Sequence, residues 1–268
     1  EILNKNKIPF ILTEHLKEFL IPNGFSIFQK KMIHNTYSMA SQILLSSSAL
    51  KNVISNNFTI HKSKLNLLPN PVDENLFTLR NIPDSKPHFT IVCISLFRPE
   101  KRIDLILESF HNLFHSGIKV KLKLIGDGPL KHDIENQIQK LGISDLVELP
   151  GYLPQNRIVE ELHNSHILVL ASDIETFGMV LIEAQACGLP VVAADCGGPR
   201  DIIRPESGIL VKPGSVSALT EGTKKLIKSF EKFDPSRIRN LAIQRFGQQK
   251  YVESIRNFTT KLISSSVD

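Results

Sequence analysis

The sequence has few cysteines and no hydrophobic run long enough to cross a membrane. Cys93, Cys187 and Cys196 are spread over 268 residues, and none belongs to a metal-binding CxxC pair. We expect reduced thiols packed inside a cytoplasmic protein. The longest apolar runs, residues 91–97 and 167–171, have the length of buried strands, whereas a membrane helix needs about 18 apolar residues.

The sequence also lacks several patterns that would point to other partners. No basic run is interleaved with aromatic residues, so we expect no nucleic-acid partner. No Asp-x-Asp pair occurs, and His and Cys do not cluster, so we expect no bound metal. The chain begins at Glu1 without the charged-then-apolar pattern of a secretion signal, and we expect upstream sequence to be missing.

The net charge of +5 favours anionic partners such as nucleoside diphosphates or acidic lipid. One expected helix has a basic face. The preferred interpretation is that this face is exposed to solvent, and the alternative is that it docks peripherally on an acidic inner membrane face. The basic residues of this face are Lys224, Lys225, Lys228 and Lys232.

Strand-like and helix-like segments alternate, which predicts an α/β protein with doubly wound parallel sheets. The expected strands are residues 8–13, 43–46, 65–68, 89–94, 120–125, 147–149, 167–170, 190–194 and 207–211. The expected helices are residues 49–54, 103–113, 130–141, 158–163, 179–187, 216–230, 236–245 and 248–263.

A polar, proline-containing stretch at residues 81–88 is expected to be a linker between two domains. Residues 1–82 would then form part of one Rossmann-like domain and residues 83–247 a second, complete one. The final helix, within residues 248–268, lies beyond this complete unit, and the family resemblance given below implies that it crosses back to the first domain. Its expected apolar stripe consists of Tyr251, Ile255, Phe258 and Leu262.

Ligands of such sheets bind where the carboxyl ends of strands meet the amino ends of helices. The loops at those ends are residues 96–101, 126–129, 151–154, 172–178 and 195–200. Four of the five contain glycine, which suits close approach of the backbone to a ligand rich in phosphates and hydroxyls.

Two glutamates flank the start of one expected helix. Gly178 begins the helix, whose free amides and positive end suit a diphosphate. Glu175 lies just before this end and Glu183 about one and a half turns beyond it, where they would accept hydrogen bonds from sugar and ribose hydroxyls. Two glutamates alone are a weak signal, but small apolar residues beside Glu183 indicate a closely packed helix.

These residues belong to a longer pattern. Glu175 is followed after seven residues by Glu183, and then by Ala184, Cys187-Gly188-Leu189-Pro190 and Gly197-Gly198. This pattern resembles the signature of family 4 retaining glycosyltransferases, which have the two-domain GT-B fold. Further landmarks of that family occur in order at residues 68–73, 99–101, 125–129, 150–152 and 208–214.

The resemblance implies a role for each matching residue. Glu175 would contact the donor sugar, Lys101 would neutralise the donor diphosphate, and His15 would be an active-site histidine supplied by the first domain. Glu183 would bind the ribose. The remaining implied donor-binding residues are Phe177, Gly178 and Met179 through their backbone, Gly126 beside the nucleotide, and Tyr152 and Leu153 near the base.

Two departures from the family pattern stand out. The basic residue expected five positions before Lys101 is replaced by Leu96, and the nearby Arg98 would supply the second positive charge or be a solvated turn residue. The family's first domain is also about twice as long as the segment before the linker, so we expect a fragment.

The expected reaction moves a hexosyl group from a UDP- or GDP-sugar to a hydroxyl acceptor with retention of configuration, without metal or cofactor. Polysaccharide or lipopolysaccharide synthesis is the expected setting. A sugar phosphorylase or epimerase of the same fold and a catalytically silent nucleotide-sugar-binding module are the alternatives. A nicotinamide-dependent dehydrogenase is disfavoured because no GxGxxG follows an expected strand.

Overall fold

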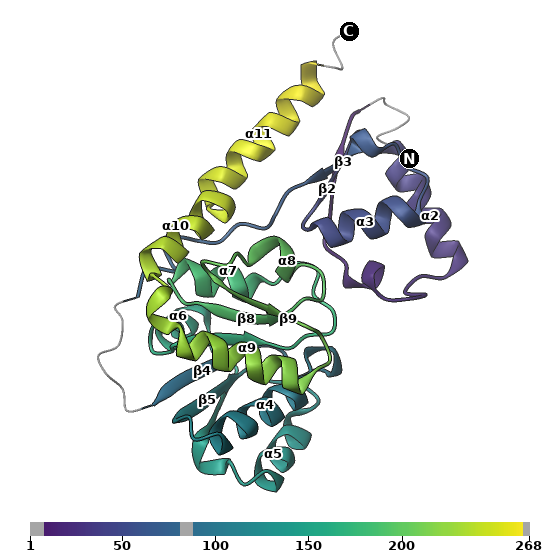
Figure 1. The fold of residues 1–268 in the computed structure, drawn as a ribbon. Coiled ribbons are helices and arrows are strands. Elements are labelled where there is room, and N and C mark those ends of the chain that lie inside the picture. Colours follow the sequence, from purple (N-terminus) through teal and green to yellow (C-terminus); the bar gives the residue numbers. More distant parts are fainter. Residues whose placement is uncertain (1–7, 81–87, 265–268) are drawn as a thin grey trace.

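The computed structural model describes residues 8–80 and 88–264, which form two α/β units of unequal size (Figure 1). The strands are β1 (Ile11–Glu14), β2 (Gln42–Leu45), β3 (Leu65–Leu67), β4 (Phe89–Ile94), β5 (Val120–Ile125), β6 (Val147–Gly151), β7 (Ile167–Leu170), β8 (Val191–Ala194) and β9 (Gly208–Val211). The α-helices are α2 (Ile27–Met39), α3 (Ser48–Asn57), α4 (Ile103–His115), α5 (Lys131–Lys140), α6 (Gln155–His163), α7 (Met179–Ala186), α8 (Pro199–Ile202), α9 (Val216–Lys228), α10 (Pro235–Phe246) and α11 (Gln248–Ser264).

The smaller unit contains a three-stranded parallel sheet in the order β1-β2-β3. Ile43 on the central strand lies opposite Leu12 and Leu65, and it is completely buried. Helices α2 and α3 complete a small core that includes an aromatic cluster of Phe19, Tyr37 and Phe58.

Helix α2 was not among the sequence-based expectations. Ser26 and Gln29 cap its amino end reciprocally, but of its side chains only Tyr37 is buried. Ile27 and Phe28 are instead 90% and 71% exposed. The apolar residues therefore do not mark one buried face, and the helical period was not visible in the sequence.

The larger unit contains a six-stranded sheet in the order β6-β5-β4-β7-β8-β9, and every neighbouring pair is parallel. Chain order reverses between β4 and β7, which is the switch point of a doubly wound sheet. An apolar stripe of α4 is buried throughout and packs into the core, and its residues are Ile103, Ile106, Leu107, Phe110 and Leu113. The six expected strands are confirmed: β4, β5 and β7 have the expected ends, and β6, β8 and β9 each have one end shifted by one or two residues.

Several expected boundaries were wrong by a few residues. β1 spans Ile11–Glu14 rather than 8–13. α9 ends at Lys228, and the 3-10 helix η5 (Phe230–Lys232) follows it. The expected linker at 81–88 lies outside the described residues except for His88.

Two regions join the units. The Val72 N–H donates to the Phe246 carbonyl at 2.8 Å, and Val72 forms a parallel bridge with Gly247. Helix α11 begins at this bridge, packs against α10 and runs away from the larger unit (Figure 1). Its stripe residues are half-buried, and the expected docking of this helix on the first domain stays a prediction.

The second region lies at the carboxyl ends of the strands. Lys17, in the 3-10 helix η1 (Lys17–Leu20), forms an ion pair with Glu100 of the larger unit. Ser48 binds Asp201 of α8 through both its N–H and its hydroxyl.

The three cysteines are free, with Cys93 and Cys187 buried and Cys196 half-buried. Within residues 8–80 and 88–264, no helix combines the length and apolarity of a membrane span.

Candidate functional site

An ion pair lies at the centre of the candidate site. Lys101 ends the 3-10 helix η3 (Pro99–Lys101) after β4, and Glu175 lies in the loop after β7. Because β4 and β7 are neighbours, their carboxyl ends bring the two side chains together, with 2.6 Å between Lys101 Nζ and Glu175 Oε2. The two side chains are only 22% and 17% exposed. The two loops are also joined by a bond from the Asp173 N–H to the Glu100 carbonyl.

Two glycines hold the Glu175 backbone in place. The Gly198 N–H donates to the Glu175 carbonyl at 2.9 Å, and Glu175 forms a parallel bridge with Gly197. A Cβ added to Gly198 would lie 2.4 Å from Phe177 Cα, so a larger residue has no room there. The Gly-Gly pair therefore lets the loop after β8 pack directly on the loop that carries Glu175.

The start of α7 follows this loop. Gly178 has φ of 107°, which a residue with a side chain rarely adopts. Phe177 is 2% exposed and packs edge-on against Phe246, so only its main chain is free to face a ligand. The first N–H groups of any helix lack intrahelical partners and carry the positive end of its dipole. The residues predicted to bind a diphosphate through their backbone thus stand at a helix end suited to an anion.

Glu183 lies further along α7, between residues that pack tightly. Ala184 and Ala186 are completely buried, while Glu183 is half-buried. Burial raises the pKa of Glu183 to about 7. Within the described part of the chain, its carboxylate has no recorded hydrogen-bond partner. Burying this carboxylate in its charged form therefore costs the protein free energy, and the carboxylate can accept hydrogen bonds from hydroxyl groups.

The loops after β5 and β6 also meet. Gly126 has φ of 142°, and a Cβ there would lie 1.9 Å from the Ser95 carbonyl oxygen. Its N–H donates to the Gly151 carbonyl at 2.9 Å, which places the predicted base-reading loop beside it. Tyr152 is 76% exposed, whereas Leu153 packs against the core. Gly126, Tyr152 and Leu153 are thus brought to one corner of the sheet edge.

The two positions that depart from the family pattern are open to solvent. Leu96 is 51% exposed at the end of β4. Arg98 is exposed, and its side chain forms no hydrogen bond or ion pair with the described residues. The pKa of Glu100 is lowered chiefly by the bond from Lys17 and, to a lesser extent, by the charge of Arg98. Arg98 therefore lies near the η3 loop, where its charge adds to that of Lys101.

His15 is exposed and immediately follows β1. Its loop is tied to the larger unit through Lys17, two residues further on, which pairs with Glu100. The sequence interpretation missed Lys17 and also Glu14, whose buried carboxylate binds Tyr37. The only available signal was their position beside His15, because nothing in the sequence pairs Glu14 with a residue in α2.

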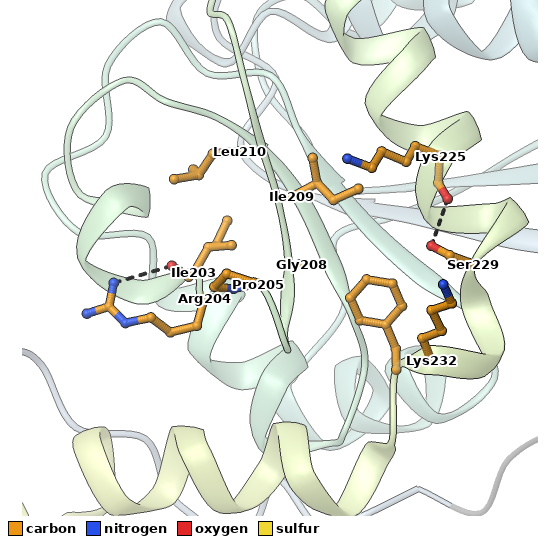
Figure 2. A pocket seen from close by; sticks show the side chains of 10 residues that line it. Ile203, Arg204, Pro205, Gly208, Ile209, Leu210, Lys225, Ser229 and Lys232 are labelled. Carbon is orange, nitrogen blue, oxygen red and sulfur yellow. Dashed lines mark hydrogen bonds between the residues drawn. The ribbon is translucent and has the colours of Figure 1, made fainter.

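Two cavities lie near the sheet but are lined by other residues. A cavity of about 550 Å³ lies at the amino end of β9, opposite the loops described above, with Lys225, Lys232 and Arg204 around apolar side chains (Figure 2). A second, of about 530 Å³, borders the η3 loop and contains Glu100, Arg102 and Asp173. Among the residues that the structure describes, no three His, Cys, Asp or Glu side chains gather as a metal site would require.

Several known proteins are similar to this chain. The family model described as "Glycosyl transferases group 1" matches residues 78–240. N-acetyl-alpha-D-glucosaminyl L-malate synthase of Bacillus anthracis is 30% identical over 193 residues, which are 68% of this chain and 50% of that protein. An uncharacterised glycosyltransferase of Methanocaldococcus jannaschii is 30% identical over 229 residues, which are 85% of this chain and 61% of that protein.

The fold is shared with a solved structure. Anabaena HepE in complex with UDP and glucose superposes with a TM-score of 0.82 at 21% identity, over 96% of this chain and 73% of that chain. The chain spans less than two thirds of the length of the curated relatives named above. The match over residues 78–240 and the shared fold show that this chain belongs to the glycosyl transferases group 1 family and has the GT-B fold.

Proposed function

We propose that the chain forms the donor-binding part of a retaining glycosyltransferase that moves a hexosyl group from a nucleoside-diphosphate sugar to a hydroxyl acceptor. One observation carries the proposal. Lys101 and Glu175 meet at 2.6 Å beside the amino end of α7, one cation and one anion at the edge where a doubly wound sheet binds its ligand.

The pair offers complementary groups to the two halves of such a donor. Lys101, the α7 amides from Gly178 onward and Arg98 would bind the diphosphate, and they would stabilise the negative charge that develops as it leaves. Glu175 would accept hydrogen bonds from the sugar. Glu183, whose carboxylate forms no hydrogen bond with residues 8–80 or 88–264, would accept bonds from the ribose hydroxyls.

The Lys101–Glu175 pair also compensates both charges. An arriving diphosphate competes with Glu175 for Lys101, which leaves the carboxylate free to turn to sugar hydroxyls. Because these fixed cations would offset the charge of the leaving group, the proposed reaction is metal-independent. Retention would follow from attack on the donor face that carries the phosphate, so no protein nucleophile is assigned.

The donor class is proposed as a UDP-sugar, since HepE is described with UDP and glucose bound. GDP-sugars are the other donors considered. The proposed setting is polysaccharide or lipopolysaccharide synthesis in the cytoplasm, with peripheral contact between the basic face of α9 and an acidic membrane. The domain assignment, with residues 83–247 binding the donor, belongs to the same proposal.

Leu96 favours a second candidate, a nucleotide-sugar-binding module without transferase activity. An exposed leucine stands where the family pattern has a second cation for the diphosphate. If Arg98 does not replace that charge, the leaving group is stabilised less and binding would persist without turnover. A phosphorylase or epimerase of the same fold would differ from both, because its turnover would depend on phosphate or need no acceptor.

Calorimetry with uridine, UDP and UDP-glucose tests the donor site. We expect UDP to bind more tightly than uridine. Lys101→Ala should weaken UDP binding by about tenfold to a hundredfold, because hydrogen bonds to charged groups are worth about 1.5–3 kcal/mol. The same substitution should leave uridine binding unaffected. Lys140→Ala, which changes an exposed lysine of α5, is the matched control.

Two outcomes would contradict the proposal. An equal loss of uridine and UDP binding in Lys101→Ala would mean that Lys101 acts through folding alone. Loss of UDP binding or turnover in a chelator, with recovery on adding manganese or magnesium, would contradict the metal-independent mechanism. Tight UDP-glucose binding without any hydrolysis would favour the silent binding module, because hydrolysis of the donor needs no sugar acceptor.

A further inference from the structure

Glu14 is a buried carboxylate at the end of β1. It is 9% exposed, although its neighbours Thr13 and His15 are both exposed. Within the described part of the chain, no ion pair with a lysine, arginine or histidine is recorded for it. A buried charge without a cation is unfavourable unless hydrogen bonds satisfy it. The contacts of Glu14 therefore indicate what keeps it there.

Three hydrogen bonds satisfy this carboxylate. Oε1 accepts the His15 N–H at 2.9 Å and the Leu16 N–H at 3.0 Å, while Oε2 accepts the Tyr37 hydroxyl at 2.8 Å. The first two bonds fold the backbone immediately after β1 around the side chain of Glu14. The conformation of the segment that presents His15 is thus set by the residue directly before it.

Tyr37 is itself held firmly. It is 2% exposed in α2, its ring stacks on Phe19 at 6.1 Å, and it meets Phe58 edge-on at 5.7 Å. Burial, followed by the charge of Glu14, raises the pKa of Tyr37, so its hydroxyl stays a proton donor. Because Phe19 lies in η1, the same cluster anchors both ends of the loop from Glu14 to Leu20.

The loop makes contact with the donor side. Lys17 pairs with Glu100, whose neighbour Lys101 pairs with Glu175. These side-chain contacts, joined by the backbone between Leu16 and Lys17 and between Glu100 and Lys101, link the aromatic cluster of the smaller unit to Glu175. A displacement of the backbone at residues 15 and 16 would move His15 and Lys17 together.

We propose that Glu14 is a positioning residue, whose carboxylate fixes the His15 loop against the donor-binding loops through the His15 and Leu16 amides and the Tyr37 hydroxyl. The role in catalysis rests on the proposed function, whereas the control of the loop does not. Glu14 itself touches no reacting atom. Its effect on turnover would pass through His15 and through the Lys17–Glu100 contact.

A set of variants separates acceptor chemistry from space filling. Glu14→Gln keeps the shape and an oxygen acceptor for the two amides, whereas Glu14→Met keeps the length without that acceptor. The double variant Glu14→Met with Tyr37→Phe removes both partners of the Glu14–Tyr37 bond, a paired removal that is close to neutral for stability. It leaves the amides of His15 and Leu16, two exposed residues, to bind water instead of Glu14. Glu18→Met, in the same loop but with no recorded side-chain bond, is the matched control.

The decisive readouts are the NMR signals of the His15 ring and the amide exchange rates of His15 and Leu16, measured on the full chain without ligand. We expect the double variant to melt close to the wild type, yet to shift the His15 signals and to speed both amides by about tenfold or more. Glu14→Gln should give His15 signals and amide exchange rates close to those of the wild type. Glu18→Met should leave both unchanged.

Donor binding and turnover are then measured with UDP-glucose. The double variant should bind it within about twofold of the wild type and turn it over about tenfold more slowly. Unchanged His15 signals and exchange rates in the double variant, or equal behaviour of the Gln and Met variants, would overturn the proposal. Unchanged turnover with a displaced His15 would overturn its catalytic part. A displaced His15 in a chain that binds no UDP-glucose would support the positioning role and contradict the proposed function instead.

Discussion

Glu183 is a single residue whose burial makes its charged form unfavourable, and a ligand that hydrogen-bonds the carboxylate would reduce this cost in free energy. Burial in α7 raises its pKa from 4.5 to about 7, so the folded protein holds a proton that the unfolded chain releases at the same pH. The stability from this proton is fully present below pH 4.5 and is lost as the pH rises through 7. A ribose that hydrogen-bonds the carboxylate would favour the charged form and oppose this loss.

We therefore expect Glu183→Gln to remove part of the pH dependence of stability. Between pH 5 and pH 8 the wild type should lose about 2 to 3 kcal/mol of unfolding free energy at this site, and the variant should not. Denaturant titration at several pH values measures the difference. Glu221→Gln, an exposed glutamate of α9, is the control. The same slope in the wild type and the Gln variant would show that Glu183 does not titrate in this range.

Arg102 stores strain at the start of α4. Its φ of 49° places a residue with a side chain in the left-handed region. Ion pairs with Asp104 at 2.8 Å and Asp173 at 3.2 Å hold it there. The pairs are partly exposed, so each is worth little on its own.

Glycine and alanine should consequently behave differently at this position. Both Arg102→Gly and Arg102→Ala lose the ion pairs, but only alanine keeps the cost of the left-handed backbone, about 1 kcal/mol. We expect the alanine variant to be the less stable of the two by about that amount in denaturant unfolding. Equal stability would show that the backbone relaxes out of the left-handed region once the arginine is gone.

At the scale of elements, the amino end of α3 binds a carboxylate of the other unit through hydrogen bonds, a contact called here the α3–Asp201 clasp. Asp201 of α8 accepts the Ser48 N–H at 2.5 Å and the Ser48 hydroxyl at 2.6 Å. Ser47 caps the same helix end by accepting the Leu50 N–H. The positive end of α3 thus stabilises a negative charge that belongs to the donor-side unit.

Asp201→Asn should weaken the hydrogen bonds to Ser48 while keeping the size of the side chain. Losing the charge at the helix end is expected to cost about 1 kcal/mol. The stronger sign would be faster amide exchange in residues 48–57, because a free α3 end opens more often. Asp145→Asn, an exposed aspartate outside the clasp, is the control. Unchanged exchange in α3 would mean that other contacts hold the two units together.

At the scale of the whole molecule, the two units have very different cores. The larger core covers a six-stranded sheet on both faces, whereas the smaller is built around three strands and one aromatic cluster. Hydrophobic stabilisation scales with the apolar area removed from water. The smaller unit should therefore open more readily.

Hydrogen exchange followed by mass spectrometry checks this expectation. Residues 8–80 should exchange faster than residues 89–245, by about tenfold or more in the strands of each sheet. Saturating UDP should slow exchange further in residues 172–183, where the donor is proposed to bind. Uniform protection along the chain would show that the two units unfold as one cooperative body.

Much of the larger unit could be predicted from sequence because its strands β7 and β8 are buried on both faces. Residues 167–170 and 191–194 read as continuous apolar runs, and the stripe of α4 has a clear helical period. α2 could not be found, since Ile27 and Phe28 point to solvent and only Tyr37 marks the buried side. Periodicity reports burial, and an element with little burial gives little signal.

The candidate site divides in the same way. Glu175, Gly178 and Glu183 lie within one strand-loop-helix segment, so their spacing together with the family pattern around them predicted a common site. The sequence by itself thus determined the parallel alternation, the glycines that permit close approach and the residue types at the strand ends. Only the tertiary structure decided that Lys101 meets Glu175, that Lys17 reaches Glu100 and that Tyr37 holds Glu14. Those pairs join elements far apart in the chain, and their distances depend on strand order and on how the two units pack, which no local pattern encodes.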